Sequence, residues 1–144
     1  MPYSVKTGSM TETRHAVGVL DTCVLIDLAQ LPDDSLPVFA RISTVTLAEL
    51  GLGVAVASTD AQRLRRMEQL QEVESSFKAL QFDSAAARRF TLLAGLVIAA
   101  KRSPKPRKLD LMIAAVASVH QLPLFTRNAK DFVGLEGALT VVAV

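Results

Sequence analysis

The run Val17-Gly-Val-Leu-Asp21 is the feature that most constrains the fold of this 144-residue chain. Small and apolar residues in succession, without polar alternation, are typical of a strand that is buried on both faces of a sheet. Asp21 follows where this strand would end, and in open α/β sheets ligands bind at the carboxyl ends of the strands. This carboxylate is therefore either a site residue or the N-cap of the next helix.

Strand-like and helix-like segments alternate along the rest of the chain. The other strand candidates are 41–45, 79–82, 124–126 and 140–144. Segments with helical composition or spacing are 22–28, 46–57, a charged stretch that runs from after Ser58 or Asp60 to about Ser76, 84–100 and 111–120. We expect Ser58 or Asp60 to cap the charged helix that ends near Ser76. The alternation predicts one α/β domain with a parallel or mostly parallel sheet.

The bulk properties exclude several other classes of protein. The longest uncharged apolar run, 92–100, is far shorter than the roughly 20 residues that span a bilayer. The N-terminus has no secretory pattern, and the one cysteine cannot form an internal disulfide. We therefore expect a cytoplasmic protein without a membrane partner. Residues 1–15 are expected to be a disordered lead or an expression remnant, and 16–144 the folded domain.

Acidic residues recur near the junctions where strands or loops lead into helices. Asp21, Glu49 and Asp110 have this context, and Asn128 or Asp131 follows the strand 124–126. If these junctions share one edge of the sheet, the carboxylates converge in one pocket. Clustered carboxylates repel one another, and an all-oxygen cluster suits Mg²⁺ or Mn²⁺. Such a site can activate water for attack on a phosphodiester.

Each of these acids also has a purely structural interpretation. Asp21 and Asp110 could be helix N-caps. The run from Thr46 to Glu49 matches a capping box, so Glu49 could satisfy an N-terminal amide. Asp131 could be a turn residue. Capping alone, however, does not require the whole set.

Four segments, taken in order, resemble a known family. They are Val19-Leu-Asp-Thr-Cys-Val-Leu-Ile-Asp27, Ile42-Ser-Thr-Val-Thr-Leu-Ala-Glu-Leu50, Leu109-Asp-Leu-Met-Ile-Ala-Ala-Val-Ala117 and Leu122-Pro-Leu-Phe-Thr-Arg-Asn-Ala-Lys-Asp-Phe132. The chain resembles PIN-domain ribonucleases, specifically the VapC toxins of type II toxin–antitoxin modules. The resemblance implies a PIN-like α/β/α sandwich with a central, mostly parallel sheet. It also implies a metal-dependent endoribonuclease that hydrolyses RNA phosphodiesters, is inhibited by a cognate VapB-type antitoxin and forms a homodimer.

The resemblance assigns roles to particular residues of this chain. Asp21, Asp110 and Glu49 correspond to the family's metal-site carboxylates, with Mg²⁺ as the expected ion and Mn²⁺ as the alternative. Asp131 joins these three in the catalytic set. Thr126 and Asn128 are supporting residues that could hydrogen-bond the phosphate or a metal-bound water. The residues expected to bind RNA phosphates are Arg107, Lys108 and Arg127, although the basic loop 101–108 could be a solvated connector.

Two further segments leave alternatives open. Cys23 stands where the family often has Ser, and we interpret it as a small packing residue. The apolar stretch 51–57 is expected in the core; alternatively, with the helix after Asp21, it forms a groove for an antitoxin helix. The competing functions are a catalytically weak RNA-binding or protein-interaction module on a PIN-like fold, and an unrelated α/β domain whose acids only cap helices.

Overall fold

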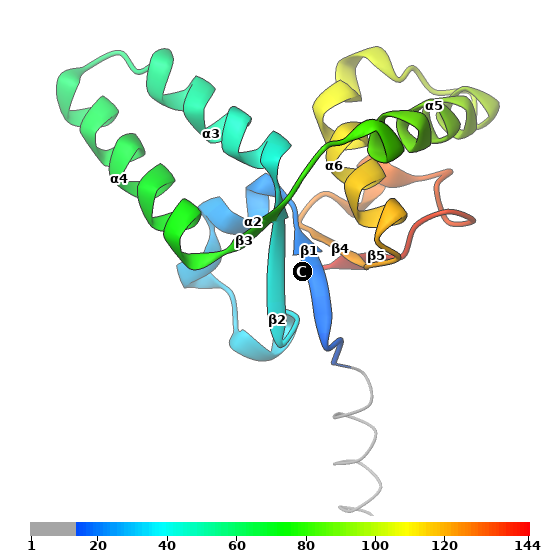
Figure 1. The fold of residues 1–144 in the computed structure, drawn as a ribbon, viewed down its shortest axis with the longest axis horizontal. Helices are drawn as coiled ribbons and strands as arrows, with labels where there is room; N and C mark the ends of the chain where they lie inside the picture. Colours follow the sequence, from blue (N-terminus) through cyan, green and yellow to red (C-terminus); the bar gives the residue numbers. More distant parts are fainter. Residues whose placement is uncertain (1–13) are drawn as a thin grey trace, which may run out of the picture.

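The computed structural model describes residues 14–144, and its centre is a five-stranded sheet (Figure 1). The strands are β1 (Val17–Leu20), β2 (Phe39–Ser43), β3 (Lys78–Leu80), β4 (Leu124–Thr126) and β5 (Val141–Ala143). Their order across the sheet is β3-β2-β1-β4-β5, and every pairing is parallel. β1 is therefore central, and all five carboxyl ends lie along one edge of the sheet.

Five α-helices connect the strands, largely as the sequence predicted. They are α2 (Thr22–Ile26), α3 (Thr44–Ala55), α4 (Asp60–Ser76), α5 (Ser84–Ala99) and α6 (Lys108–Val119). Across residues 14–144 no helix is long and apolar enough to cross a membrane. The expectation for 1–15 falls mostly on residues outside the described range. In the described part, Arg14 donates hydrogen bonds to the carbonyl oxygens of Leu36 and Asp33 at 3.2 and 3.1 Å.

Buried side chains form one apolar cluster on each face of the sheet. Neighbouring residues of β1 point to opposite faces, so Val19 belongs to the cluster with α5 and α6, and Leu20 to the cluster with α2 and Val73 of α4. Gly18 has no room for a side chain, because an added Cβ would overlap the Phe125 ring. Helices on both faces of a parallel sheet make the predicted α/β/α sandwich.

The hairpin of α3 and α4 extends away from the sheet as an arm (Figure 1). Leu52 and Val56 are 59% and 66% exposed, so the prediction that 51–57 belongs to the core is wrong for most of that stretch. The physical reason is that α3 packs mainly against α4, which leaves its far face in solvent. α3 also continues through Gly51 and Gly53 without a break.

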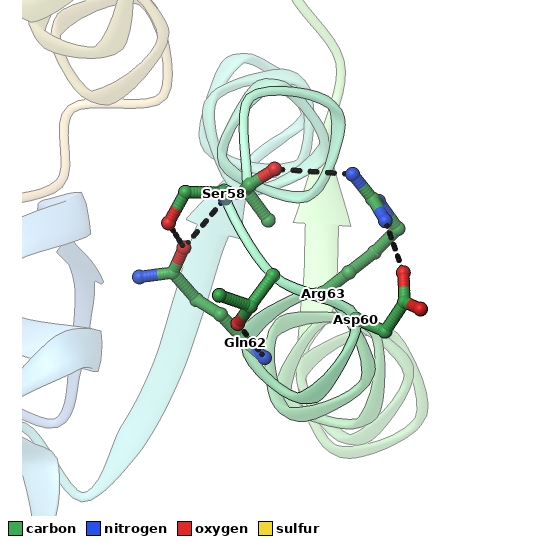
Figure 2. Close-up of polar contacts among 6 residues, drawn as sticks. Ser58, Asp60, Gln62 and Arg63 are labelled. Atoms are coloured by element: carbon green, nitrogen blue, oxygen red, sulfur yellow. Dashed lines mark hydrogen bonds and ion pairs between the residues drawn. The ribbon is translucent and has the colours of Figure 1, made fainter.

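Polar contacts fix the turn between the two helices of this arm (Figure 2). The N-cap of α4 is Thr59, whose hydroxyl accepts from the Gln62 amide at 3.1 Å, so neither Ser58 nor Asp60 is the cap. Arg63 pairs with Asp60 at 3.1 Å and donates to the Ala57 carbonyl at 3.0 Å. These contacts hold the two helices at a defined angle.

Candidate active site

Asp21 lies at the carboxyl end of the central strand and is 4% exposed. Its Oδ1 accepts a hydrogen bond from the Thr22 amide at 2.9 Å, which makes it the N-cap of α2. Its Oδ2 accepts from the Thr126 hydroxyl at 2.8 Å and from the Cys23 thiol at 3.4 Å. The structure thus realises the capping interpretation and also gives this carboxylate a second set of partners that capping does not need.

Glu49 has no capping role, so the capping-box interpretation is wrong. α3 begins at Thr44, three residues earlier than that interpretation requires, and its N-cap is Ser43, whose hydroxyl accepts from the Val45 amide at 3.0 Å. Glu49 therefore lies in the second turn, where its Oε1 accepts from the Thr22 hydroxyl at 2.7 Å. Burial and the negative charge of Asp21 raise the pKa of Glu49, while the hydrogen bond from Thr22 opposes them.

Asp110 is not an N-cap either. α6 begins at Lys108, the N-cap position is Arg107, and Asp110 is an acid within the first turn. Burial first, and then the charges of Asp21, Glu49 and Asp131, together raise the pKa of Asp110 from 3.8 to about 6. Arg107 opposes this rise. Within residues 14–144 the Asp110 carboxyl accepts no hydrogen bond, unlike those of Asp21 and Glu49.

The four acids Asp21, Glu49, Asp110 and Asp131 lie near one another at the carboxyl edge of the sheet. Each of the other three is close enough to perturb Asp110 by its charge. Glu49 and Asp110 also line a common pocket of about 360 Å³, whose other walls are Lys105, Pro106, Lys108 and Leu109. The structure thus brings together residues that are far apart in the sequence.

The carboxylates are grouped but do not form a tight cage for an ion. In the described part of the chain, no three His, Cys, Asp or Glu side chains are arranged to hold one metal directly. The donors are all oxygen, and burial together with the charges of the neighbouring acids raises the pKa of Asp110. This donor set fits Mg²⁺ or Mn²⁺, which bind few protein carboxylates and keep several waters. The ligand roles of Asp21, Asp110 and Glu49 stay a prediction.

The residues after β4 support the site through the backbone as well as through side chains. The fully buried Thr126 hydroxyl, which donates to Asp21, accepts from the Asn128 amide at 3.1 Å. The Asn128 carbonyl in turn accepts from the Asp131 amide at 2.9 Å, within a short 3-10 turn. Asp131 is therefore a turn residue, as the structural interpretation had it, and it also lies within electrostatic reach of Asp110.

Basic side chains also lie at this edge of the sheet, some beside the acids and one in an ion pair. Lys108 lines the acidic pocket, together with Lys105, and Arg107 lies close enough to lower the pKa of Asp110. Arg127 forms a half-exposed ion pair with Asp27 at 3.0 Å. The site thus has both signs of charge.

Cys23 and Thr22 make contacts in the site that the sequence did not predict. Cys23 does more than pack: its sulfur lies 3.6 Å from the Thr126 hydroxyl as well as against Asp21, and burial raises the pKa of its thiol. Thr22 was missed altogether. Its only signal in the sequence is its position directly after Asp21.

Comparison with known proteins shows the family of this chain. Residues 18–135 match the PIN domain family. The chain belongs to the PIN-domain family. It is 38% identical over 132 residues to Ribonuclease VapC5 of Mycobacterium tuberculosis, which covers 90% of this chain and 95% of the relative. The predicted resemblance to VapC toxins is therefore confirmed.

Solved structures agree with this assignment to the PIN domains. One match is the crystal structure of VapBC-5 from Mycobacterium tuberculosis, a member of the VapBC family of toxin–antitoxin systems. The TM-score is 0.78 and the sequence identity 38%, over 90% of this chain and 99% of that one. FitAcB from Neisseria gonorrhoeae matches with a TM-score of 0.69 and 25% identity over 87% and 95%. All four acids of this PIN domain lie within the matched residues 18–135.

Proposed function

We propose that this PIN-domain protein is the endoribonuclease toxin of a VapBC-type toxin–antitoxin module. The observation that carries the proposal is the group of four acids at the carboxyl edge of the sheet, where burial and the charges of the neighbouring acids raise the pKa of Asp110 to about 6. Several carboxylates close together repel one another, which a helix cap or turn residue does not require, whereas a bound cation would offset this repulsion. The relation to a named ribonuclease supports the choice of RNA as the substrate.

The chain's residues divide the chemistry of phosphodiester hydrolysis among them. Asp21 and Asp110 would hold Mg²⁺, or Mn²⁺ as the alternative, and Glu49 would bind it through water or orient the attacking water. When bound there, the ion would lower the pKa of a water and offset negative charge on the leaving oxygen. Thr22 and Thr126 fix the orientation of Asp21 by donating to its two oxygens. Asp131 adds negative charge beside Asp110.

The substrate's phosphates need positive charge beside these acids. Lys108 lines the acidic pocket, and Arg107 is close enough to lower the pKa of Asp110. Thr126 and Asn128, which are joined by a hydrogen bond next to Asp21, would hydrogen-bond the phosphate or a metal-bound water. Arg127 would leave Asp27 to bind RNA at little cost, because an exposed ion pair contributes at most about 1 kcal/mol. Binding through phosphates predicts affinity that falls as salt rises.

An apolar groove between α2 and α4 is the surface on which we expect a cognate antitoxin to bind. A groove of about 410 Å³ between α2 and α4 is lined mainly by apolar side chains, among them Leu25, Ile26, Leu28 and Val73. Ile26 is 60% exposed there, and α3 adds the exposed Leu52 and Val56 to the neighbouring arm. An amphipathic helix laid in this groove would cover these side chains. The VapBC-5 match supports an antitoxin as the partner. We also propose that the chain forms a homodimer, as the resemblance to VapC toxins implies.

The test is cleavage of RNA by the purified protein. Total RNA incubated with Mg²⁺ should acquire new, mappable ends, and chelation with EDTA should abolish them. Asp21→Asn and Asp110→Asn should lose cleavage while keeping the wild-type circular dichroism spectrum. Asp34→Asn, an exposed acid outside the site, serves as the matched control and should cleave normally.

Two results would contradict the proposal. Undiminished cleavage by both site variants would remove the carboxylates from the mechanism. Salt-sensitive RNA binding without metal-dependent cleavage would favour a binding module on the same fold.

A further inference from the structure

The first turn of α2 contacts two of the site's carboxylates at once. The backbone amide of Thr22 donates to Asp21 at 2.9 Å, and its hydroxyl donates to Glu49 at 2.7 Å. Asp21 ends β1 and Glu49 lies in α3, 28 positions further along the chain. One residue therefore sets the separation between acids that belong to different elements.

The Thr22 hydroxyl is itself held in place. It lies 3.1 Å from the hydroxyl of Thr46, which is fully buried. A hydroxyl has one proton, so when Thr22 donates to Glu49, Thr46 donates to Thr22. This chain of hydroxyls from Thr46 through Thr22 to Glu49 ties the orientation of the carboxylate to a fully buried side chain. It also leaves the second oxygen of Glu49 without a protein partner among the described residues.

We propose that Thr22 is a positioning residue that holds Glu49 in register with Asp21 for binding of the divalent cation. The inference rests on the proposed function, because it concerns the same site. It goes beyond it in assigning a role to a side chain that touches neither substrate nor ion. Groups that orient metal ligands by hydrogen bonds typically contribute about 10- to 100-fold to metal affinity or activity.

Thr22→Val tests the proposal because valine keeps the shape of threonine and loses only the hydroxyl. The backbone amide remains, so the hydrogen bond to Asp21 persists. Titration calorimetry with Mn²⁺ alone should show affinity about 10-fold weaker than in the wild type. Cleavage should show a kcat lowered by about 10-fold or more, with KM for RNA changed by less than about threefold. Thr22→Ser restores the hydroxyl and should restore both quantities.

Thr59→Val is the matched control. It removes a threonine hydroxyl that caps α4, far along the arm from the site, and should cost about 1 kcal/mol of stability. It separates a loss of stability from a loss of positioning, since its Mn²⁺ affinity should equal that of the wild type.

Three results would overturn the assignment. They are wild-type Mn²⁺ affinity in Thr22→Val, a Thr22→Ser variant as weak as Thr22→Val, and an equal loss in Thr59→Val. If the wild type binds Mn²⁺ but cleaves no RNA, the proposed function fails while calorimetry still decides the role of Thr22.

Discussion

Asp110 makes the metal-free protein less stable at neutral pH than it would be with a neutral side chain. Its pKa is about 6 in the folded chain against 3.8 in the unfolded one. Between these values the folded state binds more protons, so the stabilising contribution is fully present below pH 3.8 and is lost as the pH rises through about 6. Above that pH the folded protein holds an ionised carboxylate that burial and three neighbouring acids oppose.

The magnitude follows from the difference between the two pKa values. It corresponds to about 3 kcal/mol at 1.36 kcal/mol per pH unit. Because Asp110 is only half-buried, solvent screening reduces this to about 1–2 kcal/mol. Asp110→Asn removes the charge, so in EDTA at pH 7.5 it should melt about 3–6 °C above the wild type, using about 3 °C per kcal/mol for a chain of this size.

The assay is thermal unfolding across pH 4–8 in EDTA and again in Mg²⁺. In EDTA the wild type should lose stability as the pH rises to about 6, and Asp110→Asn should lose much less. Mg²⁺ should stabilise the wild type and have little effect on the variant, since ligand binding adds to stability only where the site is intact. Asp34→Asn should follow the wild type throughout. A variant that melts at or below the wild type in EDTA at pH 7.5 would refute the electrostatic reasoning.

Two other predictions concern parts of the molecule outside the acidic pocket. The buried Ser118 hydroxyl accepts a hydrogen bond from Arg89 and donates one to the Ala138 carbonyl, both at 2.7 Å. Ser118→Ala should therefore lower the free energy of unfolding by about 1–3 kcal/mol in urea titrations and leave cleavage unchanged. An unaltered midpoint of urea unfolding would contradict the prediction. Ile26→Glu puts a charge in the apolar groove between α2 and α4. The variant should still cleave RNA but should resist inhibition by the cognate antitoxin. Normal inhibition would exclude this groove as the antitoxin site.

The sequence predicted all five strands in order, although the second, expected at 41–45, lies at Phe39–Ser43 because α3 already begins at Thr44. Val17–Leu20 could hardly be anything other than a buried strand, and a parallel sheet followed from the alternation with helices. Asp21 was located correctly at the end of that strand. These conclusions depend on local composition, which a sequence displays directly.

The roles of the acids could not be settled in the same way. The capping box at Glu49 failed because α3 begins at Ser43 and Thr44, and several residues in that stretch can cap a helix equally well. Thr22 escaped notice because its partner, Glu49, is distant in sequence and reaches it only when β1 and β2 pair. The exposure of Leu52 depends on how far the arm stands from the sheet, which apolar composition does not reveal.

The central position of β1 has a consequence for when the protein becomes active. β4 pairs with β1 although about a hundred residues separate them in the chain, and only then does the Thr126 hydroxyl reach Asp21. Contacts between such distant segments form late, because a long loop must close first. A chain interrupted between Asp110 and Leu124 would contain Asp21, Glu49 and Asp110 without the strand that completes their surroundings. Truncated products of synthesis should therefore be harmless to the cell that makes them.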